Sequence, residues 1–381
     1  MKKIYAFGLA IVLCLLVFNF RSDTNYQSID ELRELYSQPD ASKWPEPHLD
    51  SLIDISKFRD IGLLDDVVYP ENNPYSKEKK QLGKFLFFDA RLSATGQIAC
   101  ASCHNPELAW TDNVTRSFGH NRQTNKRNAM TIKNIAFAET LFWDGRSHSL
   151  EHQAGFPLED PDEMNTSHTV AVNNISKIEG YKPLFKAAFG DDDINLDRML
   201  KAIATFERSI VSRNSKFDRF IKGKKDLYTD EEVLGLHLFR TKARCINCHN
   251  TPYFSDNQFH NDGQTLFGSK HEDLGRYNFT KNIEDIGKFK TPTLREIGET
   301  GPWMHHGHFP SLLDVLEFYN LGNPAPIQKR YLNTERDSLI PTTSPILKRL
   351  DLSKKEVNAV IAFLETLSTR KQRVNLIQMP D

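Results

Sequence analysis

The sequence has no surplus of charge of either sign. Its 381 residues carry 49 Lys and Arg against 50 Asp and Glu, a formal net charge of −1. Proteins that bind nucleic acid or another polyanion commonly carry a basic excess, so we expect no nucleic-acid partner. Hydrophobic residues make up 39% of the chain and charged residues 26%, the composition of a globular protein. The length suggests two or three domains.

Long apolar runs are also scarce, and the one that stands out lies at the N-terminus. Lys2 and Lys3 precede 16 mainly apolar residues, Tyr5–Phe20, as in an export signal. A bilayer span needs about 20 such residues, and no small-x-small cleavage site follows, so a cleaved signal and a retained anchor both stay open. Leu13, directly before Cys14, argues against a lipoprotein. We predict that residues 1–22 are an export signal or N-terminal anchor and that the folded part is periplasmic.

Cysteine is rare, and its placement carries the main signal. Of five cysteines, Cys14 lies in the apolar run, and the other four form two C-x-x-C-H motifs, Cys100–His104 and Cys245–His249. This motif attaches a c-type haem, whose vinyl groups bond the two thiols, while the following His offers a proximal ligand to the iron. A four-cysteine zinc site or two disulfides would leave both histidines unexplained. We therefore predict two covalently bound haem c groups, held by Cys100, Cys103, His104, Cys245, Cys248 and His249.

Helical patterns dominate the rest of the chain. Residues 155–166 and 250–303 are rich in loop-forming residues and are predicted to be mostly loop. Periodicity and capping residues predict helices elsewhere, over Ile29–Tyr36, from Ser76 to near Asp89, over Leu196–Val211, from Thr229 through Phe239, within Pro310–Tyr319 and after Ser353. The predicted fold is all-α, with two cytochrome c-like haem domains in tandem and long loops.

A faint internal repeat supports two related domains. The pattern Gly-x-x-Leu-Phe occurs at Gly83–Phe87, ahead of the first haem motif, and at Gly235–Phe239, ahead of the second. We predict a polar tether at residues 23–70, an N-terminal domain at 71–222 and a C-terminal domain at 223–381.

Segments around the motifs resemble the bacterial di-haem cytochrome c peroxidase and MauG family. The likeness extends from about Lys79 to Leu367. It rests on Leu86–Ser93, Phe142–Arg146, Gln153 with Pro157, Pro161–Met164 and Phe289–Arg295. The resemblance implies that the N-terminal haem reacts with peroxide and that the C-terminal haem supplies it with electrons.

The resemblance also implies a peroxide pocket at the first haem. Glu163 matches the acid–base group for cleavage of the O–O bond, Gln153 a hydrogen-bonding group for peroxide, and Pro157 a residue that blocks side access. His120, 16 residues past His104, matches a distal ligand that caps the iron at rest and leaves on activation. Without the resemblance, Glu163 would be interpreted as a solvated acid and His120 as a surface histidine. Both interpretations stay open.

Further matched residues lie between the predicted domains. Trp143 corresponds to a tryptophan between the two haems that can carry an oxidising equivalent. Trp143 can at the same time be a packing residue of the hydrophobic core. Asn128, Thr300 and Pro302 match a calcium site. One amide oxygen and two backbone carbonyls suit a hard cation, so the resemblance implies calcium as a further cofactor.

Tyr319 is the main departure from the ordinary peroxidases. It stands fourteen positions after His305, where those enzymes carry a Met ligand to the second iron and the MauG type carries Tyr. A phenolate ligand would favour ferric and higher states, whereas a thioether raises the haem potential. A packing role for Tyr319, with Met304 as the rival ligand, stays open.

Two enzymatic functions follow. The first is a peroxidase that reduces hydrogen peroxide to water with electrons from a small redox protein, a cytochrome c or a cupredoxin. The second is a MauG-like oxidase that acts on a protein substrate through a high-valent two-haem state. A non-catalytic electron carrier is a third reading, against which the pocket residues argue. The resemblance allows a homodimer and names neither donor nor protein substrate.

Overall fold

The structure, a computed structural model, describes residues 28–322, 331–370 and 377–381. The apolar run expected to direct export lies outside these residues. In the described chain, the sheet is one antiparallel pair of two-residue strands, β1 (Phe259–His260) and β2 (Phe289–Lys290). The all-α prediction is therefore confirmed. The α-helices are α1 (Ile29–Tyr36), α2 (Lys77–Phe88), α3 (Cys100–Cys103), α4 (Leu150–Glu159), α5 (His168–Ser176), α6 (Tyr181–Phe189), α7 (Leu196–Arg208), α8 (Lys216–Ile221), α9 (Asp230–Arg240), α10 (Tyr277–Thr280), α11 (Leu312–Asn320) and α12 (Lys354–Glu365).

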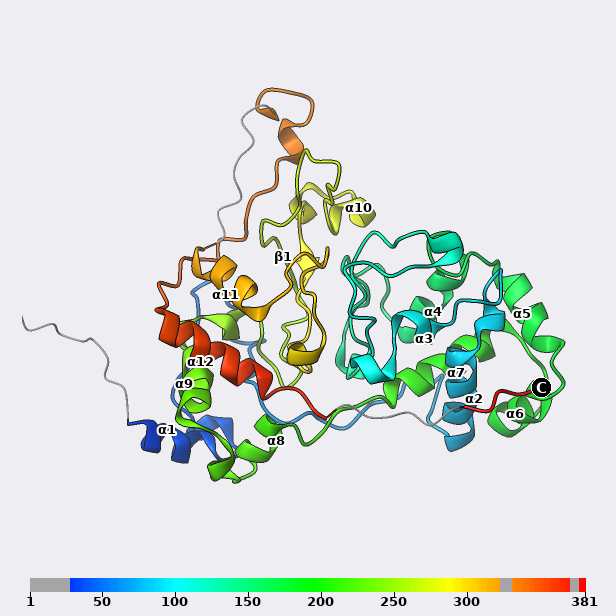
Figure 1. Ribbon diagram of the computed structural model, residues 1–381, viewed down its shortest axis with the longest axis horizontal. Helices are drawn as coiled ribbons and strands as arrows, with labels where there is room; N and C mark the ends of the chain where they lie inside the picture. The colour runs from blue at the N-terminus through cyan, green and yellow to red at the C-terminus, as the bar shows by residue number, and fades with distance from the viewer. Residues whose placement is uncertain (1–27, 323–330, 371–376) are drawn as a thin grey trace, which may run out of the picture.

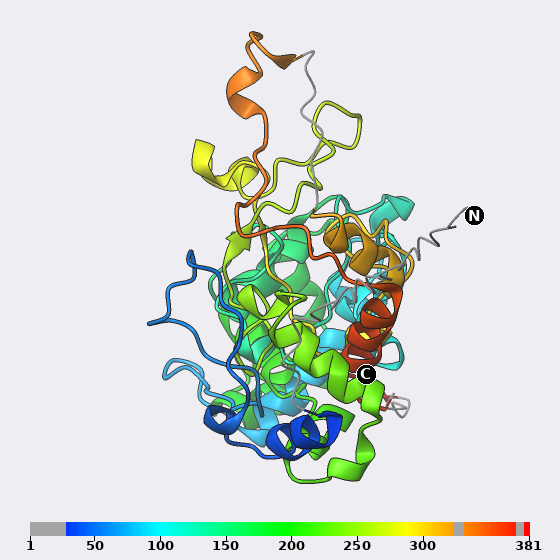
Figure 2. The same cartoon turned by 90° about the vertical axis from the view of Figure 1, so that its left-hand side faces the viewer.

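The helices gather into two groups around separate cores (Figure 1). Helices α2 to α7 surround the N-terminal core, which contains Leu86, Phe87 and Phe206. Helices α1, α8, α9, α11 and α12 surround the C-terminal core, which contains Phe239 and Phe363. Figure 2, a view along the long axis, shows the second of these groups, around the C-terminal core, in front. Each haem motif comes after a core helix in the chain, the first after α2 and the second after α9.

The repeat seen in the sequence has a physical cause. A Cβ atom on Gly83 of α2 would lie 1.8 Å from the carbonyl oxygen of Ala202 on α7. A Cβ atom on Gly235 of α9 would lie 1.9 Å from that of Ala359 on α12. Real Cβ atoms do not approach so closely, so each glycine permits a close helix crossing ahead of a haem motif.

The segment before α2 packs on the C-terminal core. Leu32 and Tyr36 of α1 and Trp44 are buried there, as are Phe217 and Phe220 of α8. The predicted boundary between residues 222 and 223 stays a prediction, as does the tether at 23–70. The packing nevertheless groups both α1 and α8 with the later half of the chain.

The loop predictions hold in one place and fail in another. Residues 250–303 are mostly irregular, interrupted by short elements such as α10 and the two strands. The prediction of loop over residues 155–166 was wrong for 155–159, where α4 continues to Glu159 with Pro157 inside it, and correct for 160–166. A proline deprives the carbonyl one turn earlier, that of Gln153, of its helical hydrogen bond, and the helix tolerates this loss near its end.

Buried ion pairs tie the two halves together. Arg127 contacts Asp144 of the first half and Asp273 of the second, at 2.7 Å in each case. The Nζ atom of Lys133 lies 3.1 Å from a carboxylate oxygen of Glu296, a residue with 0% exposure. Among the described residues, no helix is long and apolar enough to cross a membrane.

Candidate functional site

The first haem motif folds as the short helix α3 and the residue after it. His104 places its Nδ1 atom 3.2 Å from the carbonyl oxygen of Trp110. A backbone partner of this kind fixes the ring and leaves Nε2 for a metal. Burial raises the pKa of the Cys103 thiol to about 12, and Cys100 is shifted in the same direction. Neither sulfur takes part in a disulfide, so both are available to bond a haem.

The second motif repeats this arrangement on a 3-10 turn, Cys245–Asn247. His249 directs Nδ1 toward the carbonyl oxygen of Phe254 at 3.0 Å, which again leaves Nε2 available. A mostly apolar cavity, here called the C-terminal cavity, opens beside the motif. Its lining includes Cys245, Cys248, His249, Trp143, Met304 and Tyr319. Two thiols, a fixed imidazole and apolar walls fit a covalently bound haem.

The structure brings His120 and Glu163 together near the first motif. The His120 backbone N–H donates to the Glu163 carbonyl oxygen at 2.7 Å. A Cβ atom on Gly119 would lie 2.0 Å from the backbone oxygen of Asp162, so a glycine is needed at this close approach. The His120 Nδ1 atom is buried and has no hydrogen-bond partner in the described part of the chain. Its imidazole is therefore not committed to another protein group there.

Glu163 has the protonation behaviour of an acid–base group. Burial, followed by the neighbouring Asp160 carboxylate, raises the pKa of Glu163 to about 7, although Arg146 acts in the opposite direction. A carboxyl group that titrates near pH 7 can both take and return a proton at neutral pH. Its charge also acts on the thiols of Cys100 and Cys103, which places Glu163 in the neighbourhood of the first motif.

Gln153 and Pro157 lie on α4, four residues apart and so on one face of that helix. The Met164 N–H donates to the Pro157 carbonyl oxygen at 3.1 Å, which folds the loop carrying Glu163 back onto the end of α4. The predicted pocket residues thus share one connected stretch of structure. Their roles toward peroxide stay predictions.

Tyr319 and Met304 both line the C-terminal cavity. Burial, and then the charges of Asp262 and the two thiols of the second motif, raise the pKa of the Tyr319 phenol well above its usual value. Tyr319 therefore lies near the motif, as a ligand to the second iron would. Met304 also remains in position, so the choice between the two ligands stays open.

Trp143 belongs to the first half of the chain but lines the cavity of the second. Its indole N–H donates to the Asn128 carbonyl oxygen at 2.9 Å, and its own carbonyl accepts from the Lys290 N–H at 2.8 Å. Asn128, Thr300 and Pro302 line the same cavity. The Asn128 amide nitrogen donates to the Val114 carbonyl oxygen at 2.9 Å, which turns its oxygen away from that contact. Calcium at this place stays a prediction.

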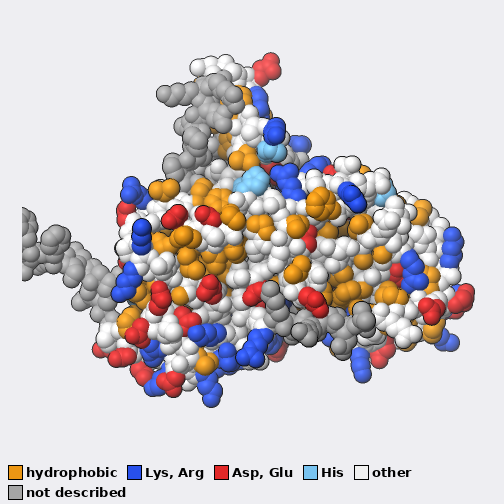
Figure 3. Space-filling model, viewed as in Figure 1, with side chains coloured by type: hydrophobic (Ala, Val, Ile, Leu, Met, Phe, Trp, Pro, Cys, Tyr) orange, Lys and Arg blue, Asp and Glu red, His pale blue; other side chains and the backbone are white. Residues whose placement is uncertain are grey.

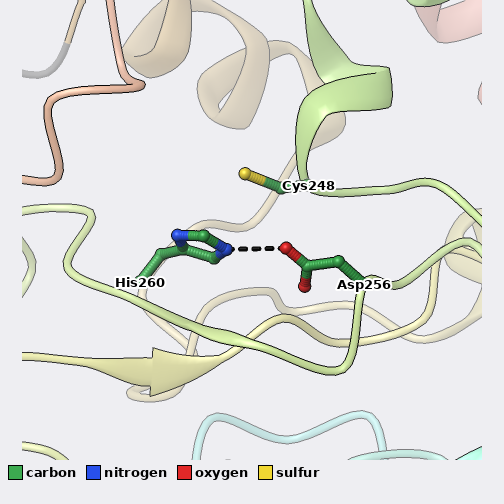
Figure 4. Close-up of side chains that lie close together, drawn as sticks. All are labelled: Cys248, Asp256 and His260. Atoms are coloured by element: carbon green, nitrogen blue, oxygen red, sulfur yellow. Dashed lines mark hydrogen bonds and ion pairs between the residues drawn. The ribbon is translucent and has the colours of Figure 1, made fainter. Parts of the chain in front are cut away.

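Sequence reasoning missed a partly buried pair beside the second motif. His260 and Asp256 form an ion pair of 2.7 Å, and Cys248 lies next to it (Figure 4). Burial disfavours the imidazolium, but the Asp256 hydrogen bond and Cys248 outweigh it and raise the pKa of His260 to about 10. The three donor atoms lie within 4.8 Å of one another. Haem attachment uses the Cys248 sulfur, so we assign no separate metal to them.

Three other buried polar residues were missed as well. Lys290 and Tyr253 line the C-terminal cavity, and Glu207 lies on α7 with 5% exposure. Burial raises the pKa of Glu207 to about 8 and lowers that of Lys290 to about 8. Lys290 stands in the segment that carries the family resemblance, which was a usable signal. For Glu207 the only signal in the sequence is that an acidic residue stands close to the apolar stripe of its helix.

Comparison with known proteins identifies the family. A family model described as di-haem cytochrome c peroxidase matches residues 77–226. The methylamine utilization protein MauG of Methylorubrum extorquens is 38% identical over 319 residues, covering 83% of this chain and 85% of that protein. Cytochrome c551 peroxidase of Nitrosomonas europaea is 35% identical, covering 77% of this chain and 81% of that protein.

Solved structures agree on the fold. A MauG-like protein associated with microbial copper homeostasis superposes with a TM-score of 0.71 at 29% identity, covering 84% of this chain and 96% of that one. The di-haem peroxidase BthA of Burkholderia thailandensis shares the fold with a TM-score of 0.66 at 23% identity, over 86% and 94% of the two chains. This chain is about equally similar to the peroxidases and to the MauG proteins. Both groups carry two c-type haems, and both attachment motifs are present here. The chain belongs to the di-haem cytochrome c peroxidase family, which includes MauG.

Proposed function

We propose that this protein is a periplasmic peroxidase that reduces hydrogen peroxide to two water molecules. The reaction consumes two protons and two electrons, and the electrons come from a small redox protein, a cytochrome c or a cupredoxin. The observation that supports it best is the contact of His120 with Glu163 beside the first haem motif. It combines a displaceable imidazole with a carboxyl group that titrates near neutrality.

Haem at the first motif supplies an iron that binds peroxide and accepts electrons. In this proposal His104 and His120 are the residues that would hold this iron in the resting protein. A loop can withdraw such a ligand at little cost. Glu163 would take a proton from one oxygen of peroxide and return it to the other as the O–O bond breaks. Gln153 orients the peroxide by a hydrogen bond, and Pro157 closes the side of the pocket.

Electrons enter through the second half of the chain in this proposal. Trp143 lies against the C-terminal cavity and bonds to Asn128 and Lys290, which suits a relay between the halves. Calcium held by Asn128, Thr300 and Pro302 would fix the same junction. Figure 3 shows acidic and basic side chains intermixed on one face and apolar side chains gathered over α11, where Leu313 and Leu321 are exposed. Such a surface suits a transient protein donor.

The second candidate is a MauG-like oxidase with a protein substrate, and Tyr319 favours it. A phenolate on the second iron would stabilise ferric and higher states and would make that haem hard to reduce in advance. The location of Tyr319 beside Cys245 and Cys248 is compatible with ligation. In this case both haems and Trp143 would share two oxidising equivalents.

Peroxide-dependent oxidation of a reduced cytochrome c or cupredoxin tests the first proposal. We expect two donor molecules oxidised for each peroxide. Glu163→Gln is expected to lower the rate by about 10²–10⁴-fold, the usual contribution of a general acid–base group. Glu159→Gln, an exposed acid near the same pocket, is the matched control and should leave the rate unchanged. Equal rates for wild type and Glu163→Gln would contradict the assigned role of Glu163.

A further inference from the structure

Two buried polar side chains of the C-terminal cavity have no role in the reaction described above. Lys290 on β2 is 2% exposed, and Tyr253 is 5% exposed. Within the described ranges, neither the Lys290 ammonium nor the Tyr253 hydroxyl makes a hydrogen bond or an ion pair. A buried ammonium without a partner is strongly unfavourable, so both groups point to a ligand that accepts hydrogen bonds.

The two groups lie together. The Lys290 Nζ atom is 6.0 Å from the centre of the Tyr253 ring, and both residues line the cavity that also contains Cys245, Cys248 and His249. Neither of the two carboxylates whose charges act on Lys290 forms an ion pair with it. Asp256 is engaged with His260 at 2.7 Å, and Glu139 is exposed; both act on Lys290 only as distant charges.

Backbone contacts fix this donor pair in place. The Lys290 N–H donates to the Trp143 carbonyl oxygen at 2.8 Å, and Lys290 pairs with Phe259 in the short sheet. The Tyr253 carbonyl accepts from the Thr293 hydroxyl. The backbones of both residues are therefore anchored, and both residues line the cavity that also contains Trp143.

The geometry points to a carboxylate as the occupant. Haem c carries two propionate carboxylates on the edge opposite its two thioether bonds. We propose that Lys290 and Tyr253 bind a propionate of the haem attached at Cys245 and Cys248. They are positioning residues: Lys290 supplies a charge-assisted hydrogen bond and Tyr253 a second donor. A positive charge at this place also favours the reduced state of that haem.

The test is a spectroscopic redox titration of the full-length protein carrying both haems. Lys290→Met removes the charge and keeps the length of the side chain. We expect the equilibrium for reduction of the second haem to fall at least tenfold, which is about 59 mV for a one-electron couple. Lys290→Arg keeps the charge and should stay within threefold of wild type. The first haem is the internal control and should not change.

Tyr253→Phe gives a second, milder test, because it deletes one oxygen atom and is expected to fold. We expect a smaller fall in the same direction, of about threefold. Resonance Raman spectra should show a shifted propionate bending band for the second haem in both Lys290→Met and Tyr253→Phe. Neither readout requires turnover, so failure here is distinguishable from failure of the peroxidase proposal.

Three outcomes would overturn the assignment. The first is an unchanged second-haem potential and propionate band in Tyr253→Phe and, if it folds, in Lys290→Met. The second is an equal shift of both haems. The third is a wild-type potential that follows added phosphate or acetate, which would indicate a free anion rather than a propionate.

Discussion

At the scale of single residues, the fold raises the pKa of two glutamates, Glu163 and Glu207. The first shift bears on the reaction and the second on stability. Glu163 lies beside His120, and its pKa is raised to about 7. As the base that first takes a proton, it must be ionised. We therefore expect the peroxidase rate at limiting peroxide to fall as pH drops through about 7. A pH profile checks this, and Glu163→Gln should lose that limb; a wild-type profile without it would contradict the role.

Glu207 makes a prediction about stability. It lies inside the N-terminal core region, and its Oε2 atom has no hydrogen-bond partner among the described residues. Burial raises the pKa of Glu207 to about 8 from a model-peptide value near 4.5. The folded state thus holds this proton more tightly than the unfolded state. The resulting stability is fully present below pH 4.5 and is lost as pH rises through about 8.

Replacing this carboxyl by an amide should remove that loss. Each unit of pKa difference corresponds to about 1.4 kcal/mol, so we expect Glu207→Gln to be more stable than wild type by a few kcal/mol at pH 8 to 9. The two proteins should converge near pH 4. Denaturant unfolding at several pH values measures this. A variant that is equally destabilised at every pH would show that Glu207 has a partner that the amide cannot replace.

At the scale of elements, two glycines set how closely helices cross before each haem. Alanine in a helix is ordinarily favoured over glycine by about 1 kcal/mol. We nevertheless expect Gly83→Ala and Gly235→Ala each to lower the free energy of unfolding by about 1–3 kcal/mol or more. Each added Cβ would meet a backbone oxygen that cannot move aside. Thermal or denaturant unfolding of the protein carrying both haems checks this.

Gly62→Ala is the control for these glycine variants. A Cβ atom at Gly62 meets nothing within 4 Å, so its stability should stay close to that of wild type. Wild-type stability for Gly83→Ala or Gly235→Ala would mean that the paired crossings are less tight than described.

Capping residues made several of these elements predictable. Helix α1 was predicted at its observed bounds, and capping boxes at Thr229 and Ser353 marked the starts of α9 and α12. Helix α4 was not predicted, and loop was expected from residue 155, because proline and acidic residues indicate loop locally while packing tolerates Pro157 near a helix end. Helices α5 and α6 were not predicted either. Their apolar faces are completed by contacts with distant helices.

At the scale of the whole molecule, the site depends on how the two halves meet. Trp143 of the first half lines the cavity of the second, and Lys133 pairs with Glu296 across the junction. Sequence patterns of single helices carry no information on such pairings. The motifs therefore gave the haem attachment residues and the resemblance gave the pocket residues, whereas the contact of Lys290 with Tyr253 emerged only when segments distant in the sequence were brought together.

The Lys133–Glu296 pair should be a main contributor to the junction. Removing one partner of a buried pair costs about 3–5 kcal/mol, because the other charge is left buried alone. We expect Lys133→Met to lower the unfolding free energy by about that amount, as measured by denaturant unfolding. The double variant Lys133→Met/Glu296→Gln should recover most of the loss. No recovery would indicate that the methionine itself disturbs the packing.

The peroxidase proposal is tested most directly by reducing the two-haem protein step by step and then adding peroxide. We predict that a mild donor reduces one haem, and that the half-reduced protein then turns over peroxide with a reduced cytochrome or cupredoxin. The contradicting result is that both haems resist mild reduction, and that the fully ferric protein forms a long-lived oxidised species with peroxide. That result would favour the MauG-like oxidase, with Tyr319 as the ligand of the second haem.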